Sequence, residues 1–121
     1  MKITFLGTGT SQGVPVIACE CEVCKSLDFR NKRLRVSVYL EIGPLQLLID
    51  AGPDFRQQML REGIKNMDAI LLTHEHKDHT AGLDDIRAFN FKHEKSMPIY
   101  ASAAVHEQLK REYSYVFSEK I

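Results

Sequence analysis

The chain has 121 residues, enough for one domain with a modest core. Its hydrophobic share of 44% and charged share of 26% are those of a folded domain and not of a disordered tail. The formal net charge is zero, which gives no long-range attraction to nucleic acid or to an anionic membrane. No stretch approaches the roughly 20 apolar residues that span a bilayer, the amino-terminal apolar run is too short for a signal peptide, and the cysteine count is odd. We therefore expect a cytoplasmic protein without membrane partners.

Strands are predicted in the first part of the chain. Residues 2–6 alternate and are rich in β-branched and aromatic side chains, which favours a strand. Val36–Ile42 and Leu45–Ile49, separated by a Gly-Pro turn, predict a β-hairpin. The segment between, from Gly7 to about Lys32, is too long for an ordinary connection, so we expect it to be functional or to need an internal clamp.

A basic run overlaps the end of that long segment. We interpret it as a solvated connection in preference to a phosphate-binding patch, because charge runs are usually solvated. Its members are Lys25, Arg30, Lys32, Arg33 and Arg35.

Helices are predicted to alternate with strands from residue 53 onward. Pro53 suits the first turn of a helix, with Phe55, Met59 and Leu60 as its buried stripe and Gly63 as its stop. Further along, the pattern predicts a buried strand at residues 69–72, a helix at 83–89, a short strand at 98–101 and a final helix capped by Ser102. The order predicts an α/β layered unit.

Four potential metal ligands follow the apolar run at residues 69–72. They are His74, His76, Asp78 and His79. Imidazole and carboxylate are the ligands expected for zinc at a hydrolytic site, and α/β proteins build their sites where strands end. The alternative is a histidine-rich polar surface loop. His93 and His106 lie outside this cluster and are expected to be solvated surface groups.

Three motifs resemble those of the metallo-β-lactamase superfamily. The sequence THEHKDHTAGL at residues 73–83 resembles its H-x-H-x-D-H motif, and LLIDAG at residues 47–52 resembles its preceding aspartate motif. The opening FLGTGTS at residues 5–11, with Pro15 and RVS at residues 35–37, is similar to two branches of the superfamily. These are the phosphonate-pathway cyclic phosphodiesterases and the zinc-dependent tRNA 3′-processing endonucleases.

The resemblance implies an αββα sandwich of which residues 1–121 form the amino-terminal portion of a single domain. It also implies that His74 and His76 hold a first metal, with Asp78 and His79 holding a second. Zinc is the expected metal, and manganese is possible. Asp50, by the same resemblance, organises the histidine loop by hydrogen bonds and does not bind metal directly.

A second cluster lies in the long segment. Cys19, Cys21 and Cys24 form C-x-C-x-x-C, which predicts a structural zinc that clamps the segment, with a fourth ligand missing locally. The alternatives are plain thiols or a disulfide. The cyclic phosphodiesterase branch resembles this chain in having such a cluster, and the tRNA-processing branch generally does not.

The predicted function is hydrolysis of a small or cyclic phosphodiester by attack of a metal-bound hydroxide, with Asp78 binding metal and positioning or deprotonating the water. One alternative is tRNA 3′ processing, with RNA as the partner. Another is a truncated, non-catalytic fragment, because the further ligands of the superfamily normally come later in the chain. An open apolar sheet face, around Val38, Leu40, Leu47, Ile49, Ile70 and Leu72, predicts a homodimer or association with the missing carboxyl-terminal half.

Overall fold

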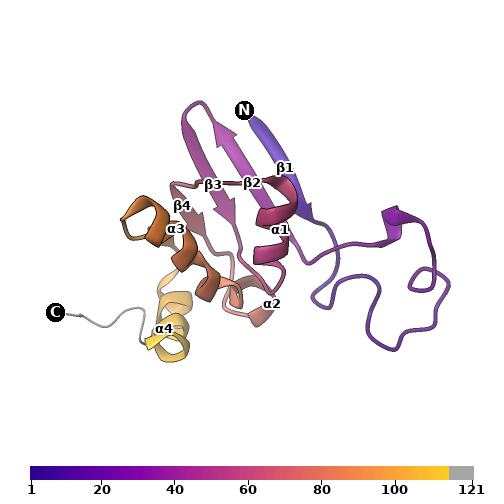
Figure 1. Cartoon of the computed structure of the whole chain (residues 1–121). Helices are drawn as coiled ribbons and strands as arrows, with labels where there is room; N and C mark the ends of the chain where they lie inside the picture. Colours follow the sequence, from indigo (N-terminus) through magenta and orange to yellow (C-terminus); the bar gives the residue numbers. More distant parts are fainter. Residues whose placement is uncertain (115–121) are drawn as a thin grey trace.

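The computed structural model describes residues 1–114 (Figure 1). Its centre is a five-stranded mixed sheet with the strands in chain order, antiparallel from β1 to β3 and parallel from β3 to β5. The α+β class predicted from the sequence is confirmed. The strands are β1 (Lys2–Gly7), β2 (Ser37–Ile42), β3 (Leu45–Ile49), β4 (Ala69–Leu71) and β5 (Ile99–Tyr100).

Helices pack against one face of this sheet. Because side chains alternate along a strand, Tyr39, Leu48 and Ile70 point to the same side, and they join Phe55 and Met59 of the first helix in the buried core. None of the helices in residues 1–114 has the length and apolar composition that a membrane span requires. The helical segments are η1 (Phe29–Asn31), α1 (Phe55–Glu62), α2 (Lys77–Thr80), η2 (Leu83–Ile86), α3 (Arg87–His93) and α4 (Ala103–Glu112).

Two helix boundaries confirm their predictions. Gly63 ends α1 with a φ of 64°, a left-handed conformation that glycine adopts without steric cost, and Ser102 caps α4 by accepting a hydrogen bond from the Val105 N–H. Two predictions about α1 are wrong. Pro53 lies in the turn before the helix, and Leu60 is 64% exposed, because the core side of the helix is filled by Phe55 and Met59.

The opposite face of the sheet is apolar and largely open. The strand register places Phe5, Val38, Ile49 and Leu71 in one row across this face, and Phe5 is 66% exposed. Ile70 was expected here, together with Leu72; this is wrong, because both are buried in the core on the helical side. Leu71, which pairs with Ile49, takes their place on this open face.

Candidate metal centre

The histidine loop begins where β4 ends and turns into α2. His76 is the residue before the helix, and Asp78 and His79 lie within it. One ligand atom from each of His74, His76 and Asp78 lies within 4.8 Å of the others. The structure thus gathers three of the four predicted ligands of this loop into one cluster.

The fourth predicted ligand, His79, adjoins the cluster. Its ring centroid lies 3.8 Å from that of His74, and its Nε2 atom lies 2.9 Å from Asp78 Oδ2. Two donors on one zinc ion lie about 3.4 Å apart when the metal–ligand bonds are about 2.1 Å long. The Nε2 and Oδ2 atoms therefore need only a small separation to bind the same ion.

Asp50 holds the other side of the His79 ring. Its carboxylate is 1% exposed, accepts hydrogen bonds from the backbone N–H and the hydroxyl of Thr73 at 2.8 and 2.7 Å, and lies 2.6 Å from His79 Nδ1. When Nδ1 donates to Asp50, Nε2 directs its lone pair toward Asp78 Oδ2, an arrangement that suits a shared cation. This carboxylate–histidine pair is the geometry that orients imidazole ligands in metal sites.

Two glycines let the loop lie against the end of β3. A Cβ atom on Gly52 would lie 2.2 Å from the Asp78 carbonyl oxygen, and one on Gly82 would lie 2.3 Å from the Gly52 carbonyl oxygen. Ala51 donates to the His79 carbonyl at 2.9 Å and accepts from the Gly82 N–H at 2.8 Å. Neither glycine was predicted from the sequence to have a role, although their place beside Asp50 and the histidine motif was a usable signal.

The donor set of the histidine loop fits a divalent metal. Imidazole nitrogen and carboxylate oxygen are the ligand types of zinc and manganese, and three of them converge here. His74 and His76 supply nitrogen, and Asp78 supplies oxygen.

The three cysteines form a second convergent cluster. One sulfur from each of Cys19, Cys21 and Cys24 lies within 4.8 Å of the others, and all three are free thiols. Val16 N–H donates to Cys24 Sγ, and Cys24 N–H donates to Cys21 Sγ, both at 3.4 Å. The hydrogen bond from Cys24 N–H, assisted by the other two thiols, lowers the pKa of Cys21 to about 7. The thiolate form, which binds metal, is therefore favoured at Cys21, whereas burial and the neighbouring thiols raise the pKa of Cys24.

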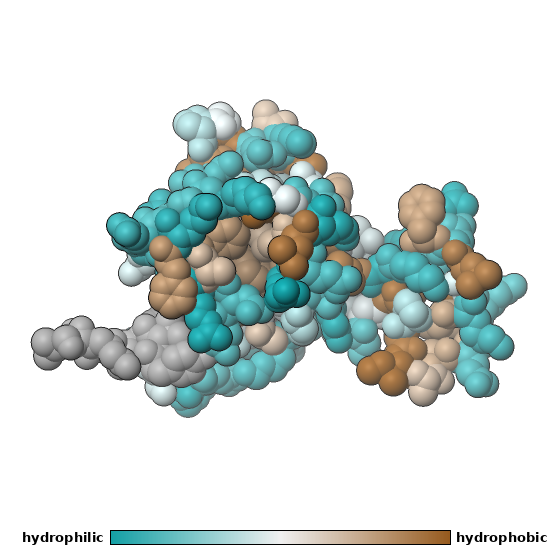
Figure 2. Space-filling model, in the orientation of Figure 1, coloured by the Kyte–Doolittle hydropathy of each residue, from teal (hydrophilic) through white to brown (hydrophobic). Residues whose placement is uncertain are grey.

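The segment that carries the cysteines projects away from the sheet (Figure 1). Two isolated bridges, Gly9 to Arg35 and Val14 to Arg33, tie its base to the chain. Apolar side chains lie on its surface (Figure 2), among them Leu27, which is 96% exposed. No residue of this segment, from Gly7 to Lys32, belongs to the buried core that the described residues form.

Much of the basic run is engaged locally. Arg30 pairs with Asp28 at 2.8 Å, and Arg35 pairs with Asp54 at 3.1 Å. Lys32 Nζ donates to the Ser26 carbonyl at 2.7 Å. These contacts support the prediction of a solvated connection.

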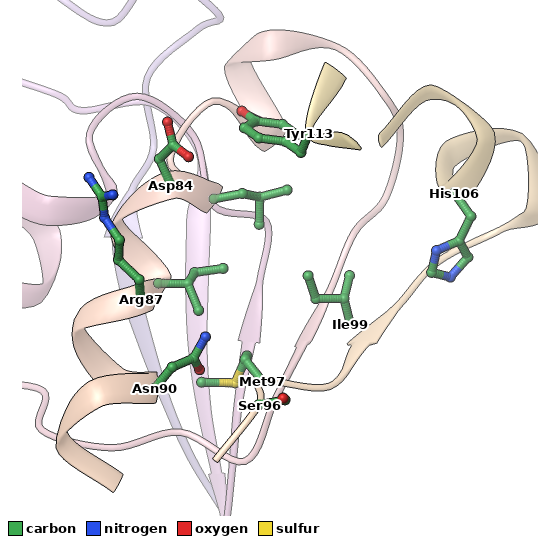
Figure 3. Close-up of a pocket in the computed structure, with 10 residues that line it drawn as sticks. Asp84, Arg87, Asn90, Ser96, Met97, Ile99, His106 and Tyr113 are labelled. Carbon is green, nitrogen blue, oxygen red and sulfur yellow. The ribbon is translucent and has the colours of Figure 1, made fainter. Parts of the chain in front are cut away.

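The two remaining histidines are only half-buried. His93 Nε2 lies 2.9 Å from the Lys65 carbonyl oxygen, and this contact is exposed at the surface. His106 lines a cavity of about 480 Å³ beside α3 and α4, across from Asp84 and Arg87 (Figure 3).

The sheet, the helices on one face and the histidine cluster at the strand ends together have the arrangement of a metallo-β-lactamase-type fold. Residues 46–121 match the model of the beta-lactamase superfamily domain. The chain belongs to this superfamily, which confirms the resemblance seen in the motifs.

Three similar proteins are each longer than the part that this chain matches. It is 45% identical over 119 residues to a protein of Porphyromonas gingivalis named octanoyltransferase, covering 97% of this chain and 24% of that protein. A solved diphosphatase from the PhnP family matches with a TM-score of 0.91 and 47% identity, covering 95% of this chain and 46% of that one. Zinc-bound PqqB of Methylobacterium extorquens matches with a TM-score of 0.74 and 28% identity, covering 92% and 40%. The chain thus spans less than half the length of each relative.

Proposed function

We propose that this chain carries the first half of the active site of a metal-dependent phosphodiesterase that acts on a small or cyclic phosphodiester. The observation that carries this proposal is the convergence of His74, His76 and Asp78 beside a His79 that Asp50 orients. The likeness to a diphosphatase of the PhnP family supports a substrate with phosphate ester or anhydride bonds.

Each residue has a distinct role in this proposal. His74 and His76 hold a first divalent metal, and Asp78 and His79 hold a second, zinc in preference to manganese. Bound metals supply Lewis-acid activation of water and of a phosphoryl oxygen. Asp78 also positions the attacking water and accepts its proton, while Asp50 keeps His79 in the tautomer that leaves Nε2 free.

The cysteine cluster is proposed as a separate structural zinc site. Three convergent sulfurs with N–H···S hydrogen bonds, of which Cys21 ionises readily, support thiolate ligation. Free thiols also support a reducing location, the cytoplasm.

Two alternatives stay open to test. Processing of RNA 3′ ends would require many phosphate contacts, and the engagement of Arg30 and Arg35 with Asp28 and Asp54 argues against such a surface. A non-catalytic fragment is the other alternative, because the relatives extend beyond the matched part. The octanoyltransferase name belongs to a protein of which only a quarter is matched, so it is not carried over.

We also propose that the open sheet face associates with a second copy of the chain. Rows of apolar side chains on this face, including Phe5, Leu40 and Leu47, leave a contiguous surface that water does not stabilise. Light scattering at low micromolar concentration should show a dimer that Leu40→Asp dissociates. A monodisperse folded monomer would contradict the dimer, and association only with a separately expressed carboxyl-terminal half of a relative would assign the face to that half.

The catalytic proposal is tested by titrating the protein with zinc and manganese while following hydrolysis of bis-(p-nitrophenyl) phosphate. Metal-dependent turnover that Asp78→Asn abolishes supports the enzyme, and metal binding without turnover supports the fragment. Competition between a small cyclic phosphodiester and a tRNA precursor then separates the two enzymatic alternatives.

A further inference from the structure

Residues at the carboxyl-terminal end of α4 contact both ends of α2. Lys77, the first residue of α2, places Nζ 2.8 Å from Glu112 Oε2 and 5.4 Å from the centre of the Tyr113 ring. Thr80, the last residue of α2, accepts a hydrogen bond at its carbonyl oxygen from the Tyr113 hydroxyl at 3.0 Å. Asp78 and His79 lie between these two contacts.

The Glu112 carboxylate is held firmly enough to act as an anchor. Its side chain is 20% exposed, and its Oε1 atom accepts a 2.6 Å hydrogen bond from Gln108 of the preceding turn. The Lys77 ammonium and the Glu112 carboxylate carry opposite charges and lie 2.8 Å apart, so they form an ion pair between the two helices. Tyr113 is buried.

α2 needs such support because it has only four residues, too few for a helix to be stable by its own hydrogen bonds. On one side it rests against the end of β3 through Gly52 and Asp50. The contacts from the end of α4 are on residues 77 and 80, whereas Asp50 contacts His79 and Gly52 lies against Asp78, so the two sets restrain different residues of the helix.

We propose that Lys77, Glu112 and Tyr113 are positioning residues that orient Asp78 and His79 for metal binding. The proposal rests on the metal site proposed above and extends it to residues more than 30 positions away in the sequence. Replacing residues that orient metal ligands without binding the metal typically lowers metal affinity by about 10- to 100-fold.

The experiment compares charge-neutralising variants of Lys77 and Glu112 with matched control variants at exposed residues of α4. Lys77→Met and Glu112→Gln are each titrated with Zn²⁺ against a chromophoric chelator and with Co²⁺, after alkylation of the cysteines. We expect about tenfold weaker binding and an altered Co²⁺ ligand-field spectrum. Exposed Glu107→Gln and Lys110→Met on α4 should bind like the unmodified chain, and Lys77→Arg should restore most of the affinity.

The outcomes separate this inference from the function it rests on. If the unmodified chain binds no metal at the histidine loop, the proposed site itself fails. If it binds metal and Glu112→Gln binds equally tightly with the same spectrum, the inference is overturned, even where the melting temperature falls. Tyr113→Phe removes the hydrogen bond to Thr80 and keeps the ring, so it provides a mild second variant should Glu112→Gln unfold.

Discussion

The two candidate metal clusters have similar local geometry and different support. In each, three ligand atoms lie within 4.8 Å of one another. The histidine loop is held from β3 by Asp50 and Gly52 and from α4 by Glu112 and Tyr113. The cysteine segment projects from the body and is tied to it mainly by two bridges at its base.

The comparison indicates two ways in which a protein can bring metal ligands together. A loop packed against the core holds its ligands in place before metal arrives, so little order is gained on binding. A projecting segment with exposed apolar side chains such as Ile17 and Leu27 buries little surface, and metal binding must supply much of its order. We expect metal removal to loosen the cysteine segment and to leave the histidine loop close to its present conformation.

The largest expected effect comes from placing the same substitution in each region. Gly82→Ala puts a Cβ atom 2.3 Å from the Gly52 carbonyl oxygen and should lower the free energy of unfolding by at least about 3 kcal/mol. Gly13→Ala, in the cysteine segment, meets nothing closer than 3.4 Å and bears only the cost of a φ of 75°, about 1 kcal/mol. Urea unfolding measures both, and equal losses would contradict the difference in packing.

Removing the anchor of the histidine loop should come next. Asp50→Ala leaves the Thr73 N–H and hydroxyl and His79 Nδ1 without their buried partner, and should cost about 3 kcal/mol of stability and weaken metal binding at the loop. Asp50→Asn keeps the shape and one acceptor and should cost about half as much. Thermal unfolding with metal titration checks this; an Asp50→Ala protein that binds metal normally would show that Asp50 is dispensable.

A smaller effect distinguishes the thiols within the cysteine segment. Because the hydrogen bond from Cys24 N–H lowers the pKa of Cys21 to about 7, the metal-free protein should alkylate Cys21 first, at a rate that rises as the pH passes through 7. Bound zinc should protect all three thiols until a chelator is added. Mass spectrometry of partially alkylated protein gives the order. Immediate reaction of all three in zinc-loaded protein would identify plain thiols.

The fold was largely predictable because its signals are local. The hairpin, the stop at Gly63 and the cap at Ser102 each depend on a few adjacent residues. Leu60 and Ile70 were misplaced because the face that a residue presents depends on where neighbouring elements lie, which periodicity alone does not specify.

The candidate site was predictable only in part for the same reason. The histidine motif is contiguous in sequence, so its four candidate ligands could be named from the sequence alone. The contacts of Lys77 with Glu112 and of Thr80 with Tyr113 join residues more than 30 positions apart, and no spacing rule predicts them. The close approach at Gly52 and Gly82 depends on the packing of α2 against β3.

Metal stoichiometry at the histidine loop tests the central claim most directly. With the cysteines alkylated, equilibrium dialysis against zinc should give at least one ion bound per chain, and replacing both His74 and His76 with alanine should abolish that binding without loss of the folded sheet by circular dichroism. Unchanged stoichiometry in the double variant would contradict the account, because the metal would then lie elsewhere.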